Sequence, residues 1–145
     1  MIVNGRNVFV GSDQPKAKDA ITSALNEAAS NQIKFEFQFD DTKRLISLKF
    51  SVEGDTKDEE LNVALIENEV TNNISRGENS GRTLHHVNIV RSFQTISLKG
   101  SKGEAIIEVP VDIAVKNASL ILYSQNSTSK RISGAAAAPL FVAGQ

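Results

Sequence analysis

The strongest constraint on the fold of this chain is a two-residue alternation in residues 33–39, which read IKFEFQF. Apolar side chains occupy the odd positions, and Lys34, Glu36 and Gln38 occupy the even ones. Successive side chains of a β-strand point to opposite faces, so this segment predicts a half-buried strand with its phenylalanines facing inward.

Further strand-like segments follow at spacings of roughly ten residues, without a helical period between them. They are LISLKFSV (45–52), LNVALIENEV (61–70), HVNIVRSFQTISL (86–98), EAIIEVPVDI (104–113), ASLILYSQN (118–126) and RISGAAAAPL (131–140). The first of them is predicted to form an antiparallel hairpin with residues 33–39. About seven short strands separated by turn signals are typical of an antiparallel β-sandwich, which we assign to a domain of residues 32–145.

Residues 1–31 have a different pattern and are expected to form a separate unit. Two apolar runs flank Asn4-Gly5, a dipeptide typical of tight hairpin turns. A helix follows, with Ser12 or Asp13 as its N-cap and Pro15 in its first turn. Its apolar face comprises Ala17, Ala20, Ile21, Ala24, Leu25 and Ala28.

A two-stranded hairpin and one helix are too little to fold alone. We therefore expect residues 1–30 either to dock on the sandwich or, as the favoured alternative, to pair with the same segment of a second chain in a homodimer.

Composition excludes several classes of function. The formal net charge of the 145 residues is -1, which gives no argument for binding nucleic acid or a membrane surface. Without cysteine the chain forms no disulfide, thiolate metal site or thiol catalyst. No apolar run is long enough to cross a bilayer, and the first residues lack the pattern of a signal peptide, so we expect neither membrane insertion nor a leader in this chain.

The segment RGENSGRTLHHVNIVR (76–91) is the one most rich in chemically versatile residues. Its candidate structural or ligand-binding residues are Arg76, Gly77, Glu78, Asn79, Gly81, Arg82, His85, His86, Asn88 and Arg91. The segment differs from a phosphate-binding loop because three residues rather than four separate its first two glycines, and a strand pattern follows in place of a helix.

Catalytic and metal sites are also weakly supported in this segment. His85 and His86 are adjacent, so on a strand they point to opposite faces and cannot chelate one ion without a bulge. A hydrolase triad could be assembled from Ser80 or Ser92, a histidine and Asp112, but no nucleophile motif marks either serine.

A structural corner is the favoured interpretation of residues 76–91, with a ligand or partner surface as the alternative. The two glycines permit positive φ in a compact loop. Glu78 and Asn79 are expected to accept from backbone N–H groups, and the arginines to pair with Glu78 or with loop carbonyls. Arg91 follows Val87 and Ile89 in phase, so we expect it to reach a buried carboxylate or carbonyl.

Three segments of the chain resemble an exported, thioredoxin-like family catalogued as domain of unknown function 1223. The first carries Val3, Asn4, Gly5, Val10 and Gly11, the second is the 76–91 block, and the third is the ending SQNSTSKRISGAAAAPL. In the second segment Gly77 to Arg82 match a GEN-x-GR block, and Asn88 to Arg91 match its closing Asn-Val-Val-Arg.

The resemblance implies a thioredoxin-like domain followed by a β-rich domain in a periplasmic or secreted parent protein. Residues 1–31 would then be the last hairpin and helix of the thioredoxin-like domain, and Met1 an internal methionine of a longer chain. The redox Cys-x-x-Cys of the family would lie upstream, so its activity does not transfer to these residues.

Two classes of function follow from the sequence. The favoured one is a non-catalytic β-sandwich portion of an exported protein, acting as an interaction or structural module without a cofactor. Its partner would be another protein, its own missing N-terminal domain or a second copy. The alternative is a metal-dependent or hydrolytic enzyme that uses the 76–91 cluster.

Overall fold

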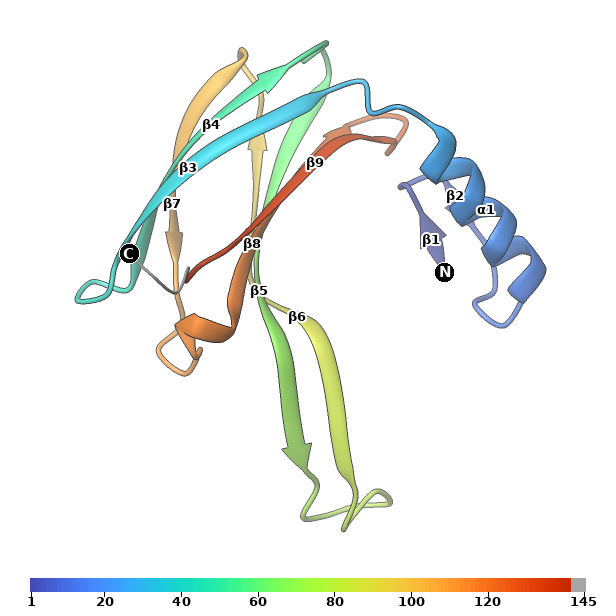
Figure 1. Cartoon of the computed structure of the whole chain (residues 1–145), viewed down its shortest axis with the longest axis vertical. Coiled ribbons are helices and arrows are strands. Elements are labelled where there is room, and N and C mark those ends of the chain that lie inside the picture. Colours follow the sequence, from blue (N-terminus) through green and yellow to red (C-terminus); the bar gives the residue numbers. More distant parts are fainter. Residues whose placement is uncertain (142–145) are drawn as a thin grey trace.

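The computed structural model describes residues 1–141, which form two antiparallel β-sheets and a smaller N-terminal unit (Figure 1). The three-stranded sheet has the order β3-β4-β7, with strands β3 (Gln32–Asp40), β4 (Leu45–Glu53) and β7 (Lys102–Glu108). The four-stranded sheet has the order β6-β5-β8-β9, with strands β5 (Glu59–Asn73), β6 (Thr83–Ser97), β8 (Ala118–Asn126) and β9 (Ile132–Pro139). The chain is therefore mainly β with antiparallel sheets, as the sequence predicts.

One hydrophobic core joins the two sheets. Its most deeply buried side chains come from both, and include Ile46, Leu48, Val52, Leu61, Val63, Leu65, Leu120 and Leu122. The predicted hairpin of residues 33–39 and 45–52 is confirmed, because Phe35 pairs with Phe50 and Phe37 with Leu48 in the β3–β4 ladder.

The phenylalanines of β3 point toward the core, but Phe35, Phe37 and Phe39 are only half-buried at its margin. Full burial would make Phe37→Ala cost about 3–5 kcal/mol. The half-buried position lowers the expected cost to about 2 kcal/mol, measured by urea denaturation. If Phe37→Ala lowered the free energy of unfolding as much as Leu48→Ala, at a fully buried position, the placement of Phe37 at the margin of the core would be contradicted.

Strand β7 is shorter than the predicted segment 104–113. It ends at Glu108, two residues before Pro110, which has no N–H to donate to the ladder. Residues 109–114 instead form a loop, followed by a short 3-10 helix, η1 (Val115–Asn117). Arg44 holds this loop against the β3–β4 turn, because it donates to the carbonyl oxygens of Pro110 at 2.7 Å and Ile113 at 3.2 Å.

The side of the four-stranded sheet that faces away from the core, here called the outer face, has two largely apolar rows next to the arm and polar rows, with Asn62 and Glu60, beyond them. The ladder register aligns one row across its strands as Phe93, Ala64, Ile121 and Ala137, and the next row as Val90, Ile66, Ser119 and Pro139. Neither row contains a charged residue. A sheet with one solvated face normally alternates apolar with polar side chains. The two apolar rows depart from that rule.

The N-terminal unit consists of a hairpin, β1 (Ile2–Val3) and β2 (Asn7–Val8), and helix α1 (Gln14–Asn26). The predicted tight turn is confirmed, because Asn4 and Gly5 both have positive φ, 53° and 74°. The helix begins where expected, with the Asp13 side chain accepting from the Lys16 N–H at 3.2 Å. No residue of α1 is buried. Within residues 1–141, no helix is long and apolar enough to span a membrane.

The hairpin turn attaches the N-terminal unit to the beginning of β9. The Asn4 carbonyl oxygen accepts from the Ile132 N–H at 3.2 Å, and a Cβ on Gly5 would lie 1.8 Å from the Lys130 carbonyl oxygen. Glu27 forms ion pairs with Arg6 at 2.8 Å and with Arg131 at 3.6 Å. The unit is held at one end of the body and otherwise stands away from it (Figure 1).

Candidate functional site

Strands β5 and β6 extend beyond the four-stranded sheet as a two-stranded arm. Strand β8 pairs with β5 only as far as Glu67, opposite Ala118, while the β5–β6 ladder continues to Asn73 and Thr83. Residues 68–88, with the loop 74–82 at their end, therefore project from the body, and they are called the arm from here on (Figure 1). Most of the 76–91 cluster lies on the arm.

The tip of the arm is an ordered loop held by its own hydrogen bonds. The Ile74 N–H donates to the Arg82 carbonyl oxygen at 2.9 Å, and the Gly81 N–H donates to the Ile74 carbonyl oxygen at 2.8 Å. Gly77 and Gly81 have φ values of 84° and 82°, a region that side chains with a Cβ avoid. The expected compact loop with positive-φ glycines is confirmed.

The side chains of the tip do not form the expected ion pairs. Arg76, Arg82 and Glu78 are exposed, and none of them makes an ion pair with another residue among positions 1–141. Backbone carbonyls replace the Glu78 and Asn79 side chains as acceptors, since the Asn79 carbonyl oxygen takes the Arg82 N–H at 3.1 Å. The expected pairing is wrong because the backbone N–H groups of the loop donate to carbonyl oxygens of the same loop, and the side chains are left in solvent.

The two histidines lie on β6, the strand of the arm that returns from the tip to the body, and both are exposed. His85 pairs with Thr71 and His86 with Val70 in the ladder, so the two rings are on opposite faces of the arm. The Nδ1 atom of His85 lies 3.1 Å from the Thr71 hydroxyl oxygen. Within the described part of the chain, no group of three or more His, Asp or Glu residues could hold a metal ion.

The serine candidates are likewise not assembled with a base. The Ser80 hydroxyl donates to the Ser75 carbonyl oxygen at 3.1 Å, inside the tip loop. Asp112 lies at the other end of the arm, where its carboxylate is bound by Arg91. Ser92 faces Leu65 in the body, whereas both histidines are on the arm. The geometry therefore separates the members of the proposed triad.

The arm leaves the body at two irregularities of β6. The register shifts so that Leu65 faces Ser92 while Ile66 faces Val90, which makes Arg91 the extra residue of a β-bulge. Three residues earlier, Asn88 has a φ of 53°, in the left-handed region. Such irregularities bend and twist a strand, and these two lie where the arm begins.

At the root of the arm, Arg91 links β5 to the loop between β7 and η1. One guanidinium nitrogen binds the Glu67 carboxylate on β5, and another binds the Asp112 carboxylate in the β7–η1 loop. Glu67 is buried, so the expected contact of Arg91 with a buried carboxylate is confirmed. On the opposite side of the arm, the Asn117 amide donates to the Glu69 carbonyl oxygen at 2.6 Å. These contacts fix the direction of the arm at its root.

The ion pair with Arg91 lowers the pKa of Asp112 below its ordinary value, chiefly through the hydrogen bond from Arg91 and then through a backbone hydrogen bond. The same contacts raise the pKa of Arg91, with the bond to Asp112 as the largest cause. A carboxylate whose pKa is lower in the folded chain than in the unfolded chain stabilises the fold at any pH above its pKa in the unfolded chain. This contribution is lost as the pH falls through its pKa in the folded chain.

Asp112→Asn should consequently lower the melting temperature at pH 7. The difference in melting temperature between the two proteins should shrink as the pH falls below about 3.8, the ordinary pKa of the group. Thermal melts of both proteins between pH 7 and pH 2, observed by circular dichroism, measure this difference. Asp19→Asn, at an exposed position of α1 that makes no ion pair within residues 1–141, is the matched control. A difference that stays constant to the lowest pH would rule out the ion pair as its origin.

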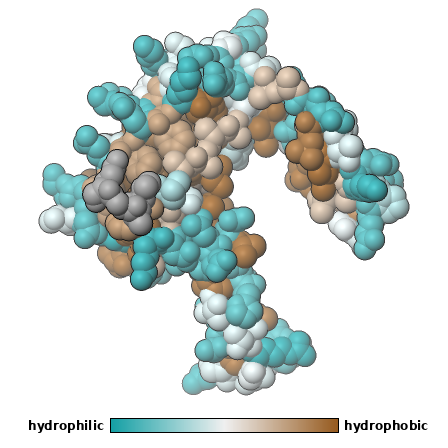
Figure 2. Space-filling view, viewed as in Figure 1, coloured by the Kyte–Doolittle hydropathy of each residue, from teal (hydrophilic) through white to brown (hydrophobic). Residues whose placement is uncertain are grey.

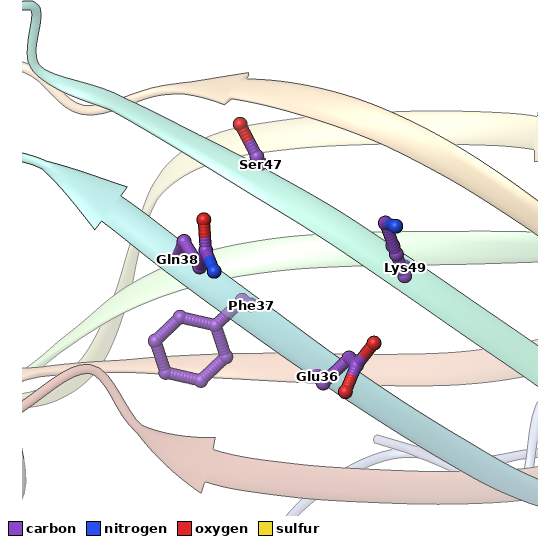
Figure 3. Close-up of a pocket in the computed structure, with 5 residues that line it drawn as sticks. All are labelled: Glu36, Phe37, Gln38, Ser47 and Lys49. Carbon is purple, nitrogen blue, oxygen red and sulfur yellow. The ribbon is translucent and has the colours of Figure 1, made fainter.

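A shallow depression lies on the other sheet, on the side of β3 and β4 away from the core (Figure 3). Its volume is about 230 Å³, and Glu36, Gln38, Ser47 and Lys49 line it together with Phe37. The Phe37 ring points away from the four polar side chains (Figure 3). These polar groups are ordinary solvent-facing residues of two strands.

Comparison with known proteins adds one decisive match. The family model described as "Protein of unknown function (DUF1223)" matches residues 1–125, which is most of the chain. The chain belongs to this family. The resemblance of three sequence segments to the DUF1223 family is thus confirmed, while the thioredoxin-like and exported character that it implies stays a prediction.

Among solved structures, the chain is similar to a domain of the outer membrane lipoprotein Omp28 from Porphyromonas gingivalis. The two are 12% identical, with a TM-score of 0.44, and the match covers 77% of this chain and 88% of that one. No curated protein matches the chain.

Sequence reasoning missed two features of the site. The projection of the arm was hidden because Thr71, Asn72, Asn73 and Thr83 are polar on both faces and give no hydrophobic alternation. The outer face was hidden for the opposite reason, since the run from Leu61 to Ile66 is nearly all apolar. Such a run is typical of a strand covered on both sides, and this signal could have revealed the outer face.

Proposed function

We propose that this member of the DUF1223 family is a non-catalytic interaction module. In this proposal the two-sheet body is a β-sandwich that serves as a platform, and the arm is the element that contacts a protein partner. The observation that carries the proposal is the placement of the candidate cluster. Its polar side chains stand exposed at the end of a projecting arm, apart from any assembled nucleophile and base.

The root of the arm supports this function because it limits the orientations that the tip can adopt. Arg91 links Glu67 and Asp112 on separate elements, and the Asn117 amide holds the backbone of β5. An element that is ordered before binding loses less conformational entropy on association. A fixed root and an exposed, internally bonded tip are therefore suited to recognition.

The chemistry of the tip favours an acceptor-rich protein surface. Arg76 and Arg82 offer planar guanidinium groups that no residue of the loop occupies, and such groups bind carboxylates through paired hydrogen bonds. The net charge of -1 gives no support for nucleic acid as the target. A protein segment with exposed carboxylates or carbonyls is the partner class that fits best.

The proposal also takes residues 1–31 as the closing part of a thioredoxin-like domain in an exported parent protein. Family membership and the helix-on-hairpin arrangement of the N-terminal unit are consistent with this origin. The partner of that unit would be the rest of its own domain or a second copy of the chain.

Site-specific photo-cross-linking in the native host tests the arm. A photoreactive amino acid at Arg82 should give a discrete adduct heavier than the chain, and the same residue at Lys49, an exposed position on β4, should not. Adducts of equal pattern from both positions, or no adduct from Arg82, would contradict the assignment of the arm as the contact element.

A further inference from the structure

Strand β6 lies at one margin of the four-stranded sheet, and within residues 1–141 no strand pairs with its free edge. Its first residues, 83–87, also stand clear of the body, because they belong to the projecting arm (Figure 1). Residues 83–87 are called the arm edge from here on. An edge strand presents unpaired backbone N–H and C=O groups, and these can form hydrogen bonds with a further strand.

A hydrogen bond at the tip determines which backbone groups of the arm edge are unpaired. The Ile74 N–H donates to the Arg82 carbonyl oxygen at 2.9 Å, so the next position of β6, Thr83, is in a ladder pair whose two residues do not bond each other. Bonded and non-bonded pairs alternate, which places His85 and Val87 in the same class. These three residues therefore direct their N–H and C=O groups away from β5.

Strand β5 gives independent support for this assignment. Glu69 faces Val87 in the ladder, so its carbonyl oxygen should also point away from the partner strand, to the opposite edge of the arm. The Asn117 amide reaches that oxygen at 2.6 Å. The opposite edge is thus partly occupied at its root. In the part of the chain that the structure describes, no hydrogen bond from outside the ladder reaches the backbone groups of the arm edge.

The arm edge lacks the residues that protect exposed edges from pairing. Natural edge strands are shielded by lysine, proline, inward-pointing charges or bulges. The two edges of the other sheet carry such residues, with Lys34 on β3 and Lys102 on β7. Residues 83–87 read Thr-Leu-His-His-Val and contain no lysine, proline or carboxylate, and the bulge at Arg91 comes after them. This edge is open to a further strand.

The side chains of the arm favour recognition through the backbone. Figure 2 shows mostly hydrophilic or neutral side chains along the part of the arm that faces the viewer. Such a surface has little apolar area to bury, so main-chain hydrogen bonds are the larger source of contact. Val87 is 69% exposed and would be covered by a side chain of an added strand. The regular edge ends at Asn88, whose left-handed backbone interrupts the alternation.

We infer that the arm edge binds an extended segment of the partner protein, which adds to β6 as a further strand. This mode of binding rests on the function proposed for the arm and specifies how the contact is made. The main chain of the segment supplies acceptors for the N–H groups of Thr83, His85 and Val87, and its own N–H groups bond their carbonyl oxygens. Arg82 directly precedes the edge, where its exposed guanidinium group binds an acidic side chain of the segment.

Proline substitution at two facing positions of the arm tests the strand addition. His85→Pro removes an N–H from the arm edge, and Thr71→Pro removes the facing N–H from the opposite edge. Proline is tolerated at an edge where the missing N–H faced solvent, so both variants should keep the melting temperature within about 3 °C. The readout is the yield of the adduct that a photoreactive amino acid at Arg82 forms in the native host.

His85→Pro should give at least about 10-fold less adduct than His85→Ala, which removes the same ring and keeps the N–H. Thr71→Pro should give as much adduct as Thr71→Ala. Equal yields from His85→Pro and His85→Ala, or equal losses from the two prolines, would overturn strand addition at this edge. Val87→Pro, compared with Val87→Ala, replaces His85→Pro if circular dichroism shows that protein to be unfolded.

The two proposals fail in different ways. No adduct from Arg82 in the chain that keeps His85 and Thr71 would contradict both the contact function of the arm and the strand addition. An adduct that His85→Pro leaves at the yield of His85→Ala would overturn the strand addition alone.

Discussion

Replacement of Leu122 by alanine is expected to lower the free energy of unfolding by about 3–5 kcal/mol. Leu122 is on β8 and is fully buried in the core that the two sheets share. The substitution removes apolar contacts and leaves a cavity between the two sheets. The sheets cannot close this cavity without distorting the hydrogen-bonded ladders that fix the positions of their strands. Urea denaturation followed by far-UV circular dichroism measures the loss.

Ile106→Ala is the control for this substitution, because it removes a similar side chain from the exposed side of β7. Its effect should remain within about 1 kcal/mol. If Leu122→Ala were as mild as Ile106→Ala, the two sheets would not share the core described here.

The second large effect is expected from Gly134→Ala. A Cβ at this position would lie 2.3 Å from the Asn31 carbonyl oxygen, a contact between two backbones that neither can relieve by rotating a side chain. Asn31 is itself fixed, since its amide donates to the Asp55 carbonyl oxygen at 3.0 Å and to the Ser133 hydroxyl at 3.2 Å. We expect a loss of about 3 kcal/mol, by the same denaturation measurement.

Gly100→Ala tests whether the Gly134 effect comes from the close approach rather than from glycine replacement in general. A Cβ on Gly100 meets no atom within 4 Å, and its φ is outside the left-handed region. This variant should be neutral or slightly more stable, because alanine restricts the unfolded chain. Equal losses in both variants would refute the explanation from Asn31.

The parts of the fold that the sequence predicted are those where one face of a strand is buried and the other is in solvent. Residues 33–39 show this alternation without exception, and their antiparallel pairing with residues 45–52 was predicted and is observed. The four consecutive alanines of the predicted segment 131–140 do lie in a strand, β9. In these segments local pattern and tertiary environment agree, so periodicity is sufficient.

The arm could not be predicted in this way. Its strands continue to Asn73 and from Thr83, beyond the predicted limits of residues 70 and 86. There the backbone ladder and polar side-chain contacts such as Thr83 to Asn73 hold the two strands together, without a buried face that would give a hydrophobic alternation. The cluster was consequently interpreted as a structural corner, with a ligand or partner surface as the alternative. Arg91 is the exception, since its position among apolar residues correctly indicated a buried carboxylate. Its identity as Glu67, on a neighbouring strand, required the register and the bulge.

The measurement that tests the central claim most directly removes the arm and leaves the body in place. Replacing residues 71–85 by Asn-Gly joins Val70 to His86, which already face each other in the ladder, through a two-residue hairpin turn. If the arm is the contact element, the shortened chain should keep its melting temperature within about 3 °C and fail to bind the partner captured from Arg82. A shortened chain that still binds that partner with unchanged affinity would contradict the account.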